Sequence, residues 1–252
     1  MYQETPRGTL SFVLFGIPVS IHPVSWVMLA LIGGGLGIDN KDSLVQTLLF
    51  VAAGMVALLA HEFGHALVGR RVGAGAAAIT IAGLGGVTQH AYLPPTRGGY
   101  FAMVAAGPLA SLALGLAAGL LFGLLIGHPF AGLLSAVLMP LPGILPMPDI
   151  YLAALADGLH THPLNPTLLR AFIILMGICF WWTVFNLFPI FPLDGGKLLG
   201  TLLHSDFKAC RAGLVFSAIL FILAALSGSI FNMMITAWIA YINFQYYRAL
   251  KS

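Results

Sequence analysis

The stretch VALLAHEFGHALVG, residues 56–69, holds three ionisable side chains, His61, Glu62 and His65, within an otherwise apolar run. The preceding residues, Leu44–Ala60, carry no charge, and the run is long enough for a helix that crosses a membrane. A carboxylate on such a helix is costly to bury, so its presence indicates a functional site. The remainder of the chain must supply the polar partners that this cluster requires.

The composition indicates a membrane protein with several spans. Of the 252 residues, 59% are hydrophobic and 8% are charged, whereas soluble domains carry about 25% charged residues. We therefore expect an all-α polytopic membrane protein whose surroundings are the lipid bilayer. The chain has only 11 lysines and arginines and a formal net charge of +3, so we expect no nucleic-acid partner.

The apolar runs predict about six transmembrane helices in a single domain over residues 1–252. The expected spans lie near residues 22–38, 44–69, 99–126, 168–188, 212–226 and 230–247. The glycine-rich segment 76–90 predicts a small β-hairpin on the inner side. Residues 12–19 are expected at the membrane interface before the first span. The proline-rich segment 129–166 is expected to form outer interfacial structure, with a short helix near 149–158.

The positions of lysine and arginine predict the orientation. With a cytoplasmic N-terminus and six crossings, the outer side carries only Lys41 and Arg170. The inner side carries the other nine: Arg7, Arg70, Arg71, Arg97, Lys197, Lys208, Arg211, Arg248 and Lys251. Cytoplasmic loops normally hold the excess of positive charge, so we expect both termini in the cytoplasm.

The H-E-x-x-H motif at residues 61–65 predicts a metal site. On a helix, His61 and His65 lie one turn apart on one face and can share a metal ion. Glu62 can then act as a general base on a water molecule at that metal. A plainer interpretation is that the three side chains face a hydrated bundle interior and hydrogen-bond to neighbours. A third ligand would decide between the two, because catalytic zinc takes three protein ligands.

The sequence NLFPIFPLDGGK, residues 186–197, supplies a candidate third ligand in Asp194, since carboxylate oxygens are normal zinc partners. Counted from Leu44, His61 lies about 25 Å into a core about 30 Å thick. Asp194 follows a span that enters from the same side. We therefore expect the two motifs to meet near the inner face of the membrane.

Asn186 has two interpretations. Its amide can donate to an oxyanion that forms on a scissile carbonyl, or it can satisfy loose backbone groups at a helix end. The prolines that follow, Pro189 and Pro192, are expected to end the helix. The glycines at 195 and 196 are expected to allow an irregular backbone.

With these two motifs the chain resembles the site-2 protease family of intramembrane zinc metalloproteases. The matching features are HEFGH at 61–65 and N-x-x-P-x-x-P-L-D-G at 186–195. Between them lie GLGG at 83–86 and AAGPLAS at 105–111, which is similar to the small-residue motif of the family's third span. The opening LFGIPVSIHPVSW, residues 14–26, resembles the sporulation-type branch.

The resemblance implies a metalloendopeptidase that cleaves a membrane-protein substrate within or near its transmembrane helix. His61, His65 and Asp194 would bind one zinc ion per chain, with Glu62 as general base and Asn186 as oxyanion donor. The hairpin would be an edge onto which an unwound substrate adds as a strand. The family reading also implies a prokaryotic cell membrane and is compatible with a homo-oligomer. We expect no PDZ-like insertion and no C-terminal regulatory domain.

Two other functions fit the same residues. A polytopic metal or solute transporter could use the His, Glu and Asp cluster as a transit site. The off-centre depth of the cluster and the lack of an internal repeat argue against it. A relative that binds membrane helices without cleaving them is the second alternative. The intact residues His61, Glu62, His65 and Asp194 argue against that one.

Overall fold

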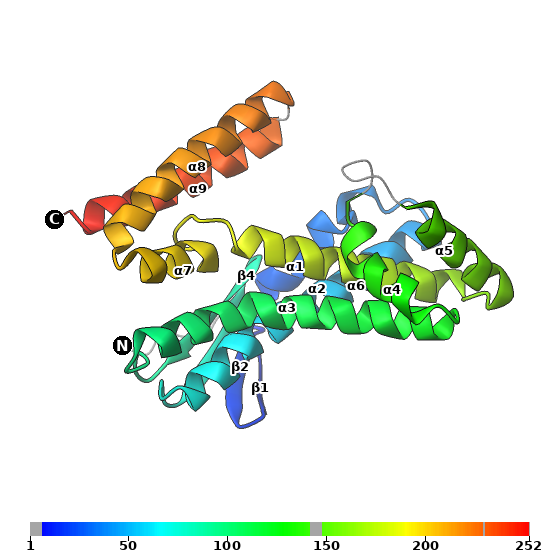
Figure 1. Ribbon diagram of the computed structural model, residues 1–252, viewed down its shortest axis with the longest axis horizontal. Helices are drawn as coiled ribbons and strands as arrows, with labels where there is room; N and C mark the ends of the chain where they lie inside the picture. Colours follow the sequence, from blue (N-terminus) through cyan, green and yellow to red (C-terminus); the bar gives the residue numbers. More distant parts are fainter. Residues whose placement is uncertain (1–6, 142–147, 229, 252) are drawn as a thin grey trace.

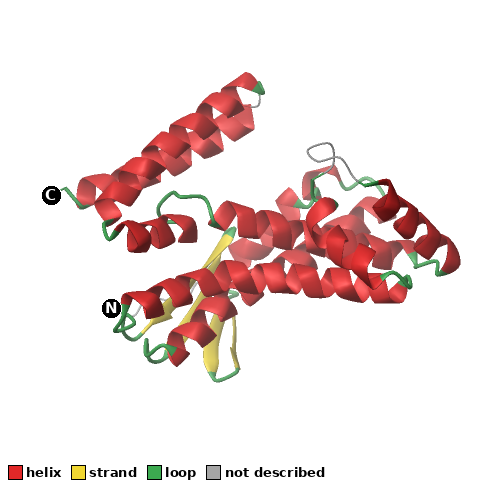
Figure 2. Ribbon diagram, in the orientation of Figure 1, coloured by secondary structure: helices red, strands yellow, loops and turns green. Residues whose placement is uncertain are grey.

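A computed structural model describes residues 7–141, 148–228 and 230–251, and it is mainly helical with one small sheet (Figures 1 and 2). The strands are β1 (Leu10–Leu14), β2 (Ile17–Ile21), β3 (Ala77–Ala82) and β4 (Gly85–His90). The helices are α1 (Pro23–Ile32), the short 3-10 helix η1 (Gly35–Gly37), α2 (Lys41–Arg71), α3 (Arg97–Leu125), α4 (Pro129–Leu138), α5 (Asp149–Thr161), α6 (Pro166–Asn186), α7 (Asp194–Leu203), α8 (Asp206–Leu226) and α9 (Ile230–Ala249).

The expected count of six spans is not confirmed. Within the described residues, four helices, α2, α3, α6 and α8, are long and apolar enough to cross a membrane, as judged by length and composition. Helix α1 has 10 residues and rises about 15 Å, half the thickness of a bilayer core. Helix α9 has 20 residues but is less apolar, because it includes Asn232, Asn243 and Gln245.

Helices α2, α3 and α6 form the core of the molecule, and they lie side by side in Figure 1. Close packing of α2 on α3 depends on glycine. A Cβ on Gly64 would overlap the Ala106 carbonyl, and a Cβ on Gly107 would overlap the imidazole of His65. The small residues of segment 105–111 therefore let α3 lie directly against the histidine-bearing turns of α2. At the opposite end of the core, Arg170 of α6 pairs with Asp42 of α2 at 2.8 Å.

The predicted hairpin at 76–90 is confirmed as β3 and β4, but it belongs to a larger sheet. The four strands are ordered β1-β2-β3-β4, with β2 parallel to β3 and the other pairs antiparallel. The run 12–19, which was expected at the membrane interface with no structure assigned to it, is part of this sheet. It forms most of the β1–β2 hairpin, whose turn has Phe15 and Gly16 at positive φ.

One face of the sheet packs on α2. Its aliphatic side chains alternate along β2 and β3 and join α2 residues in one buried cluster: Ile17, Val19, Ile21, Ala77, Ile79, Ile81, Met55, Leu58, Phe63 and Ala66. This alternation is the period of a half-buried strand. The sheet is thereby fixed in orientation against the helix that carries the H-E-x-x-H motif.

The proline-rich segment holds more helix than predicted. The short helix expected near 149–158 is confirmed as α5, while α4 was missed. Pro129 stands at the first position of α4, where its missing N–H costs nothing. A Cβ on Gly132 would overlap the backbone of Gly123, so glycine lets α4 lie close against the end of α3. Residues 142–147 of the predicted interfacial segment lie outside the described residues.

Helix α7 begins at Asp194 itself, directly before the glycines where an irregular backbone was expected. The glycines 195 and 196 are helical rather than irregular. A Cβ at Gly195 would overlap the Leu187 carbonyl, and a Cβ at Gly196 would overlap the backbone of Ile190. Glycine is therefore needed for the close approach of α7 to the loop, which returns the chain toward α2.

Helices α8 and α9 form a separate pair that packs mainly on itself and on α7 (Figure 1). Asn243 of α9, fully buried, joins this pair to the α6–α7 loop. Its side-chain oxygen accepts from the Phe191 N–H at 2.9 Å, and its amide donates to the Cys210 carbonyl at 2.8 Å. One side chain therefore connects α8, α9 and the loop that leads to Asp194.

We expect Asn243→Leu to lower the free energy of unfolding by about 2–4 kcal/mol, because two buried backbone groups lose their partners. Equilibrium unfolding of the purified protein in detergent measures this loss. Gln245→Leu on the exposed side of the same helix is the matched control and should change stability by less than about 0.5 kcal/mol. If the two variants lower the free energy of unfolding equally, the hydrogen bonds of Asn243 to the α6–α7 loop and to α8 do not stabilise the protein specifically.

Candidate metal centre

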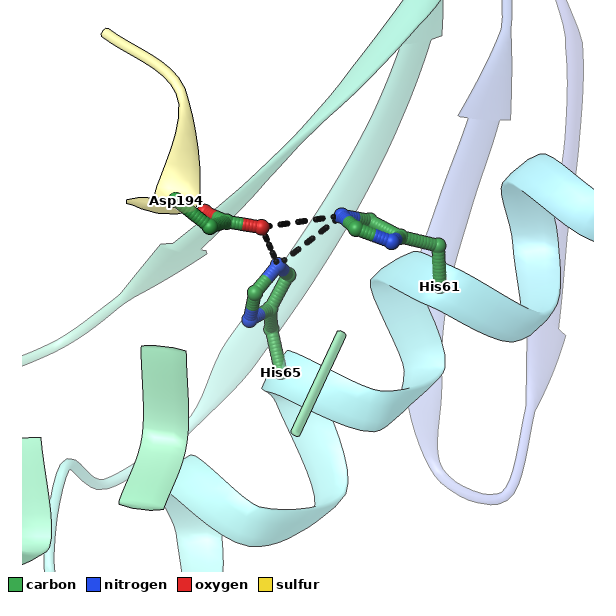
Figure 3. Close-up of side chains that lie close together, drawn as sticks. All are labelled: His61, His65 and Asp194. Carbon is green, nitrogen blue, oxygen red and sulfur yellow. Dashed lines mark hydrogen bonds and ion pairs between the residues drawn. The ribbon is translucent and has the colours of Figure 1, made fainter. Parts of the chain in front are cut away.

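The three predicted ligands come together from two distant parts of the chain. His61 and His65 lie one turn apart on α2, and Asp194 is the first residue of α7 (Figure 3). The Nε2 atoms of both histidines lie 3.1 Å from Asp194 Oδ2 and 3.2 Å from each other. His61 and Asp194 are buried, with exposed fractions of 3% and 4%. The two motifs therefore meet as expected, while their position near the inner face of the membrane stays a prediction.

A proton count at His65 indicates that a cation belongs between these atoms. His65 Nδ1 lies 2.9 Å from the Met103 carbonyl oxygen, which can only accept, so Nδ1 carries the hydrogen. In neutral His65, Nε2 then presents a lone pair to Asp194 Oδ2, which is also an acceptor. Two acceptors at 3.1 Å repel each other unless a proton or a metal ion lies between them.

The orientation of His61 is fixed in a similar way. Its Nδ1 lies 3.2 Å from Ser111 Oγ on α3, and that hydroxyl lies 3.4 Å from the Gly107 carbonyl. Both contacts are hydrogen bonds if His61 Nδ1–H donates to Ser111 Oγ and the Ser111 hydroxyl donates to the Gly107 carbonyl. The Nε2 atoms of both histidines are then left as ligands, each held by a hydrogen bond on the far side of its ring. Metal-binding histidines are commonly oriented by such partners.

The donor set fits zinc. Two imidazole nitrogens and a carboxylate oxygen are a normal set for a catalytic zinc ion with one open position. Tetrahedral bonds of about 2.0–2.1 Å place neighbouring ligand atoms about 3.4 Å apart. The observed separations of 3.1–3.2 Å are close to that value. His61, His65 and Asp194 are also the group that could hold a metal among the described residues.

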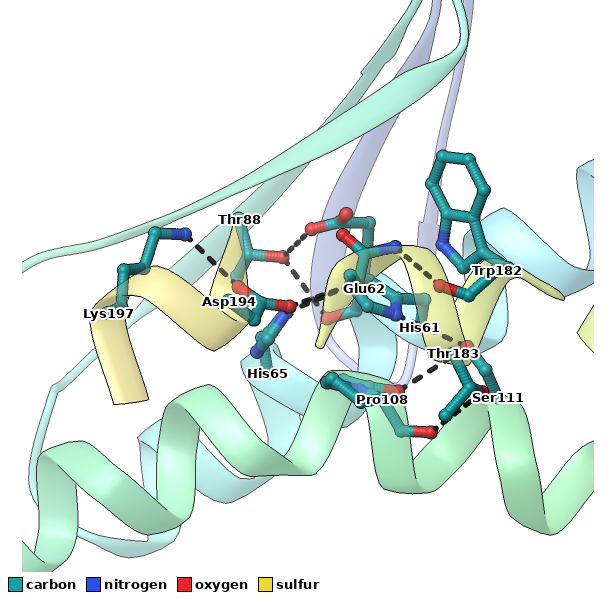
Figure 4. A network of polar contacts seen from close by, with 12 residues as sticks. His61, Glu62, His65, Thr88, Pro108, Ser111, Trp182, Thr183, Asp194 and Lys197 are labelled. Carbon is teal, nitrogen blue, oxygen red and sulfur yellow. Dashed lines mark hydrogen bonds and ion pairs between the residues drawn. The ribbon is translucent and has the colours of Figure 1, made fainter. Parts of the chain in front are cut away.

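Asp194 is supported by a cation at its second oxygen. Lys197, one turn along α7, donates to Asp194 Oδ1 at 3.1 Å, while Oδ2 faces the histidines (Figure 4). The side chain of Lys197 is 37% exposed, and that of Asp194 is 5% exposed. The lysine therefore offsets part of the cost of burying this carboxylate and leaves a single oxygen for the metal.

Glu62 lies beside the cluster but outside it. It is 4% exposed, and its Oε2 accepts from the Thr88 hydroxyl at 2.6 Å. Its carboxylate is not among the atoms that converge with His61, His65 and Asp194. This is the arrangement expected of a base that acts next to a metal rather than on it.

Asn186 is buried at the last residue of α6. Its amide donates to the Trp182 carbonyl at 2.9 Å, which is the helix-end role considered above. One of its two amide hydrogens is used in this bond. The oxyanion role therefore depends on the second hydrogen and stays a prediction.

His90, at the end of β4, does not join the cluster. Its ring packs over Gly69 of α2, where a Cβ would overlap it. Burial lowers the pKa of this imidazole, although backbone contacts at Ala66 and His65 oppose the shift. Among the described residues its Nε2 is buried without a hydrogen-bond partner.

Four groups of the site were not found from the sequence: Thr88, Met103, Ser111 and Lys197. Ser111 lies at the end of the small-residue motif 105–111, and Lys197 lies one turn after Asp194. The positions of these two residues next to recognised motifs could have predicted that they belong to the site. Thr88 depends on the pairing register of the sheet, and Met103 acts through its backbone, so neither is visible in the pattern of residue types.

Comparisons with known proteins agree with this geometry. The model of peptidase family M50 matches residues 49–227, a range that includes His61, Glu62, His65 and Asp194. A zinc metalloprotease of Methanocaldococcus jannaschii is 26% identical over 196 residues, which are 78% of this chain and 45% of that protein. The chain thus spans about half the length of that relative.

The fold has a solved counterpart. The structure of a site-2 protease from Methanocaldococcus jannaschii aligns with a TM-score of 0.57 at 20% identity and covers 95% of each chain. At this identity the likeness shows the fold. The family match covers most of the chain and includes both motifs that supply the candidate metal ligands. The chain belongs to peptidase family M50.

Proposed function

We propose that the protein is a zinc-dependent endopeptidase that hydrolyses a peptide bond within or near the transmembrane helix of a membrane protein. The observation that carries the proposal is the convergence of His61, His65 and Asp194 at 3.1–3.2 Å, with the buried Glu62 beside them. Membership of family M50 and the four apolar helices support a peptidase that works in the bilayer.

Each residue has a defined task in this proposal. His61, His65 and Asp194 would hold the zinc ion, which would supply a Lewis acid that polarises a peptide carbonyl and lowers the pKa of a water molecule to about 7. Glu62 takes a proton from the attacking water as the new C–O bond forms. It then gives that proton to the amide nitrogen as the C–N bond breaks. Asn186 donates its second amide hydrogen to the carbonyl oxygen, where negative charge develops.

Strand β4 offers a place for an unwound substrate. It is an edge strand, since no other described strand pairs with its outer side. The Ala91 N–H bonds to the Ala76 carbonyl, and backbone groups of successive residues alternate in direction along an antiparallel strand. The backbone groups of Gly86, Thr88 and His90 therefore point to the free edge. A substrate segment can pair with them in extended form, which exposes its carbonyls to attack.

An apolar cavity of about 250 Å³ lies next to the metal centre. It is lined by α1, α2, α6 and the hairpin residue Leu84. Trp182 lines the cavity, and its ring meets that of His61 edge-on at 6.1 Å. A cavity of this size and lining suits a large aliphatic or aromatic substrate side chain.

The transporter alternative is less well supported. His61 lies 20 residues after the start of α2 and 10 before its end, or about 30 Å and 15 Å along the helix. A transit site is expected near the bilayer midplane. The ligand cluster lies toward one end of the core, and Glu62 is hydrogen-bonded to Thr88 rather than part of the cluster.

The first test of the proposed function concerns Glu62. In Glu62→Gln we expect full zinc content and a loss of cleavage of at least about 100-fold, because the amide cannot accept the proton of water. Metal analysis together with cleavage of single-span test proteins, with and without a chelator, measures both. Asp157→Asn changes an exposed carboxylate in the same way and should leave both unchanged. Undiminished cleavage by Glu62→Gln would exclude the general-base role.

The second test concerns the third ligand. Asp194→Ala should weaken zinc binding by at least about 10-fold, because two imidazoles alone bind zinc less tightly than three ligands. Competition with a chromogenic chelator gives the affinity. Asp157→Ala is the control, since it also removes a carboxylate that contacts a histidine, His128, at 2.9 Å. Equal affinities in all three proteins would remove Asp194 from the metal site.

The third test addresses the substrate class. Membranes from cells with Glu62→Gln should accumulate an uncleaved single-span protein that cells with the wild-type protein process. A comparison of the two membrane proteomes by mass spectrometry identifies it. If the proteomes match and metal uptake by the cells differs instead, the transporter alternative is the better account.

A further inference from the structure

Strand β4 lies along α2 with alternate side chains facing the helix. Gly86 and Thr88 both reach Glu62, and His90 lies over Gly69. The neighbouring positions on β2 and β3 that face α2 are Ile17, Val19, Ile21, Ala77, Ile79 and Ile81, all apolar and buried. A hydroxyl at Thr88 is therefore an exception on this face, and it stands opposite a buried carboxylate.

The contact between Thr88 and Glu62 is short and specific. The hydroxyl lies 2.6 Å from Glu62 Oε2 and 3.1 Å from the Glu62 carbonyl oxygen. A threonine hydroxyl has one hydrogen, and a bond to a carboxylate is the stronger of the two choices. The hydrogen therefore lies mainly toward Oε2. Because χ1 of a β-branched residue is restricted, the donor is held in one position.

The second oxygen of Glu62 is confined by backbone. A Cβ at Gly86 would lie 2.5 Å from Glu62 Oε1 and 2.6 Å from its Cδ. Glycine thus lets the strand lie directly against the carboxylate. Between the Gly86 backbone and the Thr88 hydroxyl, Glu62 is kept out of the group formed by His61, His65 and Asp194.

We propose that Thr88 is a positioning residue that holds the Glu62 carboxylate as a base and keeps it from becoming a fourth metal ligand. The inference rests on the proposed function, since it assigns Glu62 the role of base. A carboxylate free to turn toward zinc would fill the position that catalytic sites keep open for water. The hydrogen bond from Thr88 opposes that rotation.

The location of Thr88 connects base and substrate. Its side chain faces Glu62, and its backbone N–H and C=O point to the free edge of β4. A substrate strand paired at this edge would bond to the backbone of the residue that orients the base. Thr88 would thereby align the scissile carbonyl of the substrate with the Glu62 carboxylate.

The test compares Thr88→Val with Thr88→Ser, because valine keeps the shape and serine keeps the hydroxyl. In Thr88→Val we expect kcat to fall roughly 10–100-fold, as for other groups that orient a metal site. KM should stay within about twofold, because the backbone groups at the edge remain. In Thr88→Ser we expect kcat within about threefold of wild type. Thr80→Val on β3, whose side chain points to the other face of the sheet, is the matched control.

A second readout needs no substrate. In protein loaded with cobalt in place of zinc, we expect the visible absorption of Thr88→Val to change as the carboxylate becomes a ligand. The spectra of Thr88→Ser and Thr80→Val should match wild type.

An unchanged kcat or an unchanged spectrum in Thr88→Val would overturn the inference. A Thr88→Ser variant whose kcat falls as far as that of Thr88→Val would overturn it too. If wild-type protein cleaves no test protein, the proposed function fails, while the cobalt spectra still decide the role of Thr88.

Discussion

The constraint on which the structure depends is the meeting of three electron-rich atoms inside an apolar protein. Two imidazole nitrogens and a carboxylate oxygen converge at 3.1–3.2 Å, an arrangement that is stable only around positive charge. The surrounding elements maintain it. Helix α3 supplies acceptors behind both imidazoles, α7 carries the carboxylate and its lysine, and the sheet covers the face of α2 that carries Glu62. Glycines at the helix crossings make this density of contacts sterically feasible.

The sequence correctly predicted those parts of the structure that depend on long apolar runs or on the spacing of residues within a short motif. The apolar runs predicted α2, α3, α6 and α8 to within a few residues at most ends, since hydropathy follows directly from the cost of burying polar groups in lipid. The spacing within 61–65 and the carboxylate at Asp194 predicted that the three side chains converge, because helix geometry and the direction of the spans determine where they lie. The count of six is not confirmed at the ends of the chain, where α1 ends before the glycines that follow Ile32 and α9 is less apolar.

What the sequence could not predict is contact between distant segments. Strand β2 pairs with β3 although about 60 residues separate them, and an isolated apolar run such as 12–19 gives no sign of its partner. The position of Thr88 opposite Glu62 follows from the register of β4 on β3 and from the way the sheet packs on α2. A shift of one residue in the register would turn Thr88 to the other face. Helix α4 was hidden because its first residue is a proline, which marks a helix start as well as a helix end.

The three proposed metal ligands belong to two parts of the molecule that differ in their attachments. His61 and His65 are part of the α2, α3 and α6 core, whereas Asp194 follows a loop tied by Asn243 to the pair α8 and α9. A bound metal ion is therefore also a crosslink between the core and this pair. Its binding free energy adds to the stability of their relative orientation, so chelation would loosen the architecture as well as stop the chemistry.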